Sequence, residues 1–383
     1  MNNDTVNLAL EGAFYEATVP DTLDLAERAR LAINGLGGNI DPALLTMYGL
    51  IHFCARRPHL SHWASAETLC DPKFAESFPL MRLMSGGDQY ADLERQFRDA
   101  ILSRVDDGLY WDRAESRRPW RNAYAPEFYG AGRNEDFCTV AGAGRLLRAL
   151  LVWRELGGGA NNDRLLDELC GGLRRILIVK GDYGYYPEKG GWGEPCAYPR
   201  SGWLNQDEAG RDTEGSEGGI TCMHGHQLYG AAHWYERSGS HVALDLATKL
   251  ANYCLLPRFW GGVPDPTGAR AGLPAHIAPS RPDPPFTAGA EQGHWYSHFH
   301  ARAITLRGLL AYAQATANAR VIEFVRRAYE FTLSQGIPRM GWINCYPGAL
   351  NQMEGCALGD LIGLGVRLSD AGAGDYWDDV DAT

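Results

Sequence analysis

Apolar residues recur at helical spacing along most of the chain, and one local pattern repeats. An amphipathic helix ends in a short polar turn, and a second helix follows at once. The clearest copies cover residues 144–177, 228–256, 306–334 and 358–381. Two further pairs are expected upstream, one formed by 21–37 with 41–57 and the other by 64–84 with 88–105. The pattern therefore predicts six helical hairpins.

Six hairpins bury their inner faces by closing into a ring, so we expect an all-α fold, the (α/α)6 toroid. An open helical solenoid is the alternative. A two-domain α/β fold is disfavoured because the sequence lacks regularly spaced runs rich in Val and Ile. We expect one domain over residues 1–383. The chain stops within its last predicted helix, which is typical of a fragment or a C-terminal truncation.

The links between hairpins are long, in contrast to the short turns within them. They cover roughly 106–138, 181–219, 257–294 and 336–352, and in a ring all of them lie on one rim. Loops of this length are usually functional or disordered, and these carry too many aromatic residues for disorder. Trp192, Trp203 and Trp295 are therefore predicted to stack on sugar rings at this rim. Packing back onto the helices is the alternative.

Titratable side chains crowd the points where the long links enter the next helix. The carboxylates are Asp136, Glu217, Glu291 and Glu354, and the imidazoles are His224, His226, His294, His298 and His300. A carboxylate there can simply cap the helix, whereas a histidine gains nothing from the positive end of the helix dipole. The four acids are candidate catalytic residues. Four of the histidines, His224, His226, His298 and His300, are candidate substrate ligands, and Arg302 is expected to help bind a uronate carboxylate.

Three of these histidines stand within the stretch GHWYSHFHARAITLRGLLAYA, residues 293–313. His294 and His298 are four apart and can share a helix face, while His300 lies about 200° around from His298. At most two of the three would then point inward. His294 with His298, or Cys222 with His224 and His226, are conceivable metal ligands, although neither group matches a strong motif such as HExxH.

Composition narrows the classes of partner. The formal net charge is −11 and no block of Lys and Arg is present, which argues against a nucleic-acid partner. The sequence has neither a signal peptide nor an apolar run long enough to cross a membrane, so we expect a cytoplasmic protein without a membrane partner. Nine cysteines occur without a CxxC pair, which predicts reduced core residues. The oligomeric state is left open.

At the last helix pair the chain resembles a known family. The string MEGCALGDLIGLGVRLSDAGAGDYWDDVD, with Glu354 and Cys356 at its start, is similar to the E-T-C-A helix start of β-L-arabinofuranosidase-type glycoside hydrolases. These belong to the six-hairpin glycosidases and have an (α/α)6 catalytic domain. GAAHWYERSG and the segment His298 to Tyr329 extend the resemblance to roughly residues 220–383.

The resemblance implies a retaining hydrolase with a cysteine nucleophile and a zinc ion held by one Glu and three Cys. Glu354 and Cys356 match the Glu and the first Cys of that zinc site. The family's adjacent cysteine pair, which includes its nucleophile, has no counterpart before Thr383, and residues 336–352 contain no Glu. The resemblance therefore supports the fold and a sugar-binding role but not the thiolate mechanism. Zinc is not required by the sequence, although Glu354 and Cys356 could hold it.

Carbohydrate chemistry unites these features. We expect a glycoside hydrolase that acts on a plant or microbial oligosaccharide through a pair of carboxyl groups, one protonated and one ionised. One alternative is a polysaccharide lyase or unsaturated-uronide hydrolase, because a fold does not settle a function. A second alternative is a non-catalytic glycan-binding protein, which the missing nucleophile makes plausible.

Overall fold

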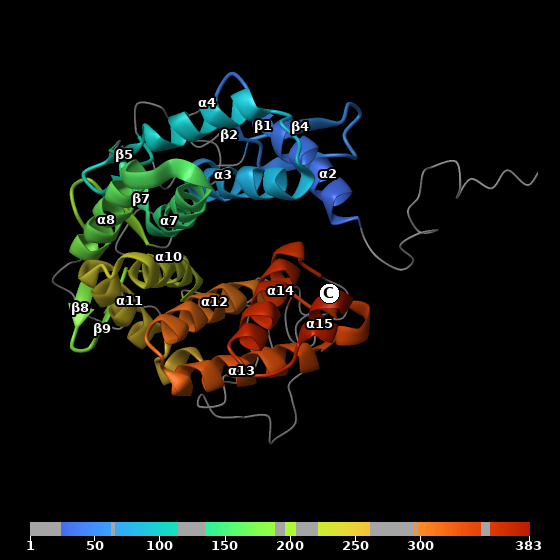
Figure 1. Cartoon of the computed structure of the whole chain (residues 1–383). Helices are drawn as coiled ribbons and strands as arrows, with labels where there is room; N and C mark the ends of the chain where they lie inside the picture. The colour runs from blue at the N-terminus through green and yellow to red at the C-terminus, as the bar shows by residue number, and fades with distance from the viewer. Residues whose placement is uncertain are drawn as a thin grey trace, which may run out of the picture.

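The structure is a computed structural model that describes residues 24–62, 66–113, 135–187, 196–203, 221–260, 295, 298–345 and 353–383. Most described residues are helical, and the helices follow one another in pairs around a common centre (Figure 1). The inner helices are α3 (Ala66–Ser85), α7 (Val140–Trp153), α10 (Cys222–Ser238), α12 (Phe299–Ala315) and α14 (Gly355–Asp370). Their outer partners are α4 (Ala91–Leu102), α8 (Gly159–Ile176), α11 (His241–Cys254), α13 (Ala319–Ser334) and the short α15 (Trp377–Ala382).

Each inner helix packs on the next one around the ring, from α3 to α7, α10, α12 and α14. The first and last of them meet where Lys73 Nζ donates a hydrogen bond to Cys356 Sγ at 3.7 Å. Helix α2 (Leu25–Gly38) packs against α3. The fold is thus all-α and of the (α/α)6 toroid class, as the repeated hairpin pattern predicts. Turns of two to three residues separate α10 from α11 and α12 from α13, in keeping with the short turns of the predicted hairpins.

The first predicted hairpin is wrong in its second half. Residues 41–57 do not form a helix, because the chain there runs through two antiparallel ribbons. The ribbons pair β1 (Ile40–Asp41) with β2 (Thr46–Met47), and β3 (Leu50–His52) with β4 (His59–Ser61). The Asp41 carboxylate accepts hydrogen bonds from the backbone N–H groups of Ala43 and Leu44, at 2.9 and 3.3 Å. Leu45 then adopts a positive φ of 51°, which ends any helical path.

Small ribbons also occupy the described parts of the long links. They pair β5 (Val105–Asp106) with β6 (Leu109–Tyr110), β8 (Ile178–Lys180) with β9 (Tyr183–Tyr185), and β11 (Gly336–Ile337) with β12 (Trp342–Ile343). One further ribbon, β7 (Phe137–Thr139) with β10 (Ala197–Pro199), joins two different links. These two links therefore lie on the same side of the ring. Buried hydrophobic residues from Ile40 to Tyr376 form one core cluster, and within the described chain no helix is long and apolar enough to span a membrane.

Glycines let the inner helices approach closely. A Cβ atom added at Gly142 of α7 would lie 2.0 Å from the backbone oxygen of Thr68 in α3. We expect Gly142→Ala to lower the free energy of unfolding by about 1–3 kcal/mol, because the backbone of α3 would have to move. Gly171 of α8 is the control, since a Cβ there meets no atom within 4 Å. Gly171→Ala should stabilise the protein by about 0.5–1 kcal/mol. Urea unfolding curves that shift equally for both variants would refute this account of the packing.

Candidate functional site

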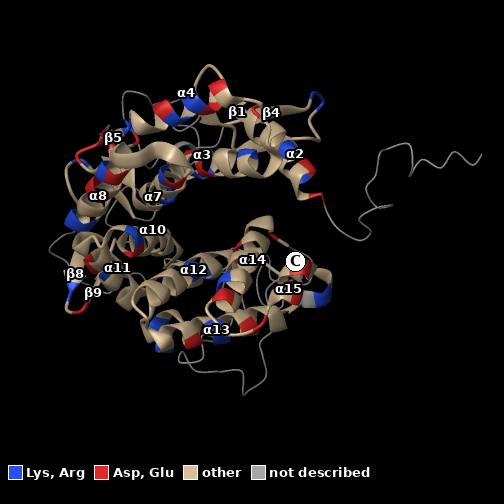
Figure 2. Ribbon diagram, in the orientation of Figure 1, with Lys and Arg blue, Asp and Glu red and all other residues tan. Residues whose placement is uncertain are grey.

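The centre of the ring contains a pocket with a volume of about 400 Å³. Side chains from all five inner helices line it, including Lys73, Arg145, His226, His300 and Cys356. Most of them come from the N-terminal halves of their helices, where the long links arrive. The volume lies in the range of small-molecule sites. Figure 2 shows basic residues on the inner helices α3, α7 and α12.

The floor of this central pocket consists of two ion pairs, which an aromatic ring outside the pocket lining supports. Arg148 of α7 bonds to Glu76 of α3 at 2.9 Å, and Arg307 of α12 bonds to Asp360 of α14 at 2.7 Å. The ring of Tyr229 lies against both guanidinium groups, 4.9 Å from Arg148 Cζ and 5.3 Å from Arg307 Cζ. Because these contacts join all five inner helices, the floor is a fixed surface on which a ligand can rest.

Asp360 also fixes one histidine of the pocket. The second carboxylate oxygen of Asp360 bonds to His300 Nδ1 at 2.8 Å. Asp360 itself is only 4% exposed. Burial alone would raise the pKa of Asp360, but the hydrogen bond from His300 and the charge of Arg307 outweigh it and hold this pKa below its usual range. A carboxylate on Nδ1 leaves Nε2 of His300 as the nitrogen that faces other partners.

Glu354 stands at the start of α14, yet its carboxylate makes no capping bond to that helix. It bonds instead to Nε2 of His298. This hydrogen bond lowers the pKa of Glu354, against the opposing effect of partial burial, and the charges of His298 and His300 add to the shift. Glu354 is therefore an ionised carboxylate held in a defined orientation.

His298 and His300 both reach this corner of the pocket, their ring centroids 5.8 Å apart. His298 precedes the first residue of α12 and has an extended backbone, with φ −57° and ψ 120°. The offset of about 200° expected from helical spacing therefore does not apply to this pair. His294 lies outside the described residues.

A metal could be held at the same corner. His300, Glu354 and Cys356 each offer one ligand atom, and these atoms all lie within 4.8 Å of one another. Imidazole, carboxylate and thiolate together are a donor set that zinc accepts. The bond from Asp360 to His300 Nδ1 and the bond from His298 to Glu354 would orient two of the three ligands. The residues present thus fit a zinc ion.

His226 lines the opposite wall from α10 and is only 5% exposed. Its Nδ1 atom is buried and makes no hydrogen bond to a described residue. Burial and the neighbouring charges of Arg145 and Arg148 hold the pKa of His226 well below its usual range. The imidazole is therefore neutral at pH 7, and one of its nitrogens is available to a ligand.

Two other predicted ligands belong to the core of the ring. His224 is fully buried, and its Nε2 accepts a hydrogen bond from the backbone N–H of Tyr186 at 2.9 Å. Arg302 is 3% exposed and donates to Thr221 Oγ1 at 3.1 Å and to the backbone oxygen of Phe259. Neither residue lines the central pocket. Nor does Cys222, the third member of the alternative metal group.

The two predicted platform tryptophans that the structure describes are both buried. Trp203 is 6% exposed and donates from Nε1 to the backbone oxygen of Ile176 at 2.7 Å. Trp295 is fully buried between Trp260 and Phe331, with ring centroids 5.8 and 5.5 Å away. Both tryptophans therefore pack back onto the helices, which is the alternative to stacking on a sugar ring. Trp192 lies outside the described residues.

Asp136 lies away from the central pocket, beside strand β7. Its carboxylate pairs with Arg200 at 3.4 Å, and Arg200 also bonds to Asp106 at 2.7 Å. Two other predicted catalytic acids, Glu217 and Glu291, lie outside the described residues. Of the predicted site, the structure thus brings together Glu354, Cys356, His226, His298 and His300.

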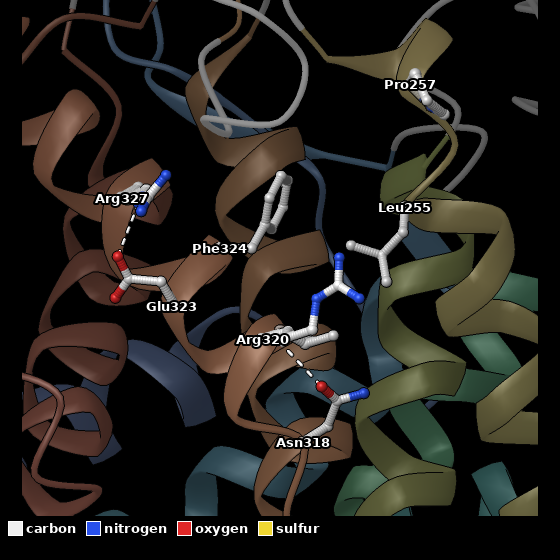
Figure 3. Close-up of a pocket in the computed structure, with 8 residues that line it drawn as sticks. Leu255, Pro257, Asn318, Arg320, Glu323, Phe324 and Arg327 are labelled. Carbon is white, nitrogen blue, oxygen red and sulfur yellow. Dashed lines mark hydrogen bonds and ion pairs between the residues drawn. The ribbon is translucent and has the colours of Figure 1, made fainter.

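A larger hollow of about 620 Å³ lies between the outer helices α11 and α13 (Figure 3). Leu255, Arg320 and Phe324 line it, and its single carboxylate, Glu323, is paired with Arg327 at 2.7 Å. No histidine or cysteine of the described chain lines this hollow. Of these two pockets, the smaller central one is the better candidate for chemistry, because its described lining combines imidazole, thiol and carboxylate groups.

Sequence reasoning missed the residues that α3 and α7 contribute to the pocket. Arg145 and Arg148 stand three apart in the otherwise apolar helix VAGAGRLLRALLVW, and Lys73 and Glu76 have the same spacing in α3. A charged pair on one face of a buried helix needs partners in the interior. The spacing of these charged residues in the sequence could therefore have identified them as part of an interior site.

Two solved structures align with nearly the whole chain. One is unsaturated glucuronyl hydrolase from Bacillus sp. GL1, with 14% identity, a TM-score of 0.44 and coverage of 92% of this chain and 98% of that chain. The other is a UGL variant with dGlcA-Glc-Rha-Glc, with 14% identity, a TM-score of 0.41 and coverage of 95% and 99%. No family model and no curated protein matches the chain. Likeness at this level carries no argument about activity, so the resemblance to β-L-arabinofuranosidase-type hydrolases stays a prediction.

Proposed function

We propose that this protein is a glycoside hydrolase that cleaves an oligosaccharide at the central pocket. The observation that carries the proposal is the ionised Glu354, held by His298 at the corner of a polar pocket of about 400 Å³. Enzymatic hydrolysis of a glycosidic bond usually needs an ionised carboxylate that acts on the anomeric carbon or on the attacking water. Glu354 supplies that group, because it is oriented by a histidine and not used to cap its own helix.

The second carboxyl group must be protonated so that it can donate to the leaving oxygen. Glu76 and Asp360 do not suit that role, since each forms an ion pair with an arginine in the pocket floor. The sequence offers Glu217 and Glu291, which precede α10 and α12 along the chain. We propose that one of them is the general acid.

The proposal is tested by incubating the protein with a panel of aryl glycosides and uronide-containing oligosaccharides. A hydrolase produces a new reducing end without a product that absorbs in the ultraviolet. Glu217→Gln and Glu291→Gln, assayed on the active substrate, identify the general acid. Binding of an oligosaccharide without turnover, unchanged by Glu354→Gln, would instead support the non-catalytic glycan-binding function.

A lyase is the second candidate, and His226 is the observation that favours it. A lyase needs a neutral base near a substrate carboxylate whose charge is offset by a cation. His226 is neutral, and Arg145 lines the same pocket. The same panel separates the two functions, because a lyase releases an unsaturated product that absorbs in the ultraviolet and a hydrolase does not.

We propose zinc binding as an alternative role for Glu354, which would then hold the ion together with His300 and Cys356. When bound, the ion would polarise a substrate oxygen or a water molecule. Protein dialysed against zinc and then against buffer should retain one zinc ion per chain by elemental analysis, and Cys356→Ala should lose most of it. Cys54→Ala is the matched control, because Cys54 is exposed and lies outside the pocket. Equal zinc contents in the two variants would contradict the site.

A further inference from the structure

The central pocket carries more positive than negative charge, although the whole chain has a formal net charge of −11. Four basic side chains line it, Lys73, Arg145, Arg148 and Arg307, against the two carboxylates of Glu76 and Asp360. Each carboxylate is already paired with an arginine of the floor. The ionised Glu354 at the corner of the pocket is bonded to His298. Lys73 and Arg145 are therefore the two cations of the lining that form no ion pair with a carboxylate of the described chain.

The environment of Arg145 shows how this charge is held. Its Nη1 atom donates to the backbone oxygen of Leu69 at 2.6 Å and to Cys70 Sγ at 3.4 Å, which fixes the guanidinium against α3. Among the described residues no carboxylate pairs with Arg145 or with Lys73, whose ammonium group contacts Cys356 Sγ at 3.7 Å. A fixed, partly buried guanidinium with unused N–H donors is suited to binding an oxyanion through two parallel bonds.

His226 provides an independent observation at the same place. Its ring is 95% buried, and its Nδ1 atom is without a hydrogen-bond partner in the described chain. Because Nδ1 is enclosed by the protein, Nε2 is the nitrogen through which this pocket-lining ring can reach a ligand. In the tautomer with a proton on Nε2, His226 donates to an oxygen atom.

We propose that Arg145, Lys73 and His226 form an oxyanion subsite that binds the carboxylate or sulfate group of an acidic sugar. The inference rests on the proposed function only in taking the ligand to be a saccharide. A neutral sugar would leave two cations uncompensated and would form neutral hydrogen bonds, which are worth about half as much as charge-assisted ones. An acidic group on the sugar satisfies the guanidinium, the ammonium and the imidazole together.

The experiment measures binding rather than turnover, so its outcome is separate from that of the activity panel. Isothermal titration calorimetry compares glucuronate, glucose 6-sulfate and glucose, with EDTA present so that no metal contributes. We expect the wild-type protein to bind at least one of the two anionic sugars about tenfold or more tightly than glucose, a ratio that corresponds to about 1.4 kcal/mol. A preference for glucuronate over the sulfate identifies the group as a carboxylate, and the reverse preference identifies a sulfate.

Variants assign the preference to the named residues. Arg145→Gln should remove most of the preference for the anionic sugar, and Arg320→Gln, an arginine of the outer hollow beside α13, should have no effect. If Arg145→Gln does not fold, Lys73→Met replaces it, because the Lys73 side chain is exposed and its loss does not disturb the core. The proposal is overturned if glucose binds as tightly as the anionic sugars, if none of the three binds, or if the preference survives in the folded pocket variant.

Discussion

Replacing Glu354 by Gln is expected to reduce turnover of the oligosaccharide substrate by about 10²- to 10⁴-fold. Glutamine keeps the size of the side chain and its hydrogen bonding to His298 but cannot carry the negative charge. KM should change much less than kcat, because the carboxylate acts mainly on charge that develops in the transition state. Steady-state kinetics on the best substrate of the activity panel provides the measurement.

Two further variants show whether the effect belongs to the charge of Glu354. Glu168→Gln alters a carboxylate on the outer helix α8 that pairs with Arg164 at 2.6 Å, and it should leave kcat unchanged. His298→Gln removes the imidazole that orients Glu354 and should cause a smaller loss than Glu354→Gln. A Glu354→Gln enzyme that retains wild-type kcat would eliminate Glu354 from the reaction.

The sequence was sufficient for the ring because each hairpin repeats the same local rule. An apolar helix face must be buried, and a short polar turn such as the one at Gly239, with a φ of 72°, brings the next helix back beside it. The rule failed at residues 41–57, where Asp41 bonds to nearby backbone N–H groups and competes with helix formation. A local side-chain bond of this kind is hard to distinguish from a helix cap by sequence alone.

The site could be predicted only in part, because position along the chain does not reveal which way a side chain points. The starts of α12 and α14 were expected to carry chemistry, and they do bring His298, His300, Glu354 and Cys356 together. His224 and His226 are two residues apart at the start of α10, yet only His226 lines the pocket. Successive helix positions differ by about 100°, so two neighbours in sequence face different surroundings.

The tryptophans show again that position along the chain does not reveal which way a side chain points. Trp203 and Trp295 stand at the ends of long, polar links, where an open platform for a sugar ring is a reasonable expectation. Both side chains are buried, and Trp295 lies among aromatic rings of α12, α13 and the end of the α11 link. Burying a large aromatic side chain stabilises the folded chain at all times, whereas an exposed ring gains contacts only while a ligand is bound. Core packing therefore decided where these rings lie.

Asp360 contributes both to the stability of the helical ring and to the central pocket, because it pairs with Arg307 and bonds to His300. We expect Asp360→Asn to lower the free energy of unfolding by about 3–5 kcal/mol, because it removes the buried counter-charge of the partly buried Arg307. Asp107→Asn is the matched control, since its pair with Arg175, at 2.9 Å, is exposed on both sides. That substitution should cost no more than about 1 kcal/mol. Urea unfolding at pH 7, with EDTA in the buffer, measures both variants.

The pH dependence of the free energy of unfolding gives a second test of the Asp360–Arg307 ion pair. The pKa of Asp360 is held below its usual value in the folded protein, so its ionised form stabilises the fold at any pH above about 4, the usual value for an Asp in an unfolded chain. As the pH falls through the lower folded-state pKa, wild-type Asp360 becomes neutral like the asparagine. The difference in unfolding free energy between the two proteins should therefore shrink as the pH falls below about 4. A difference that persists unchanged at acid pH would mean that asparagine disturbs packing rather than charge.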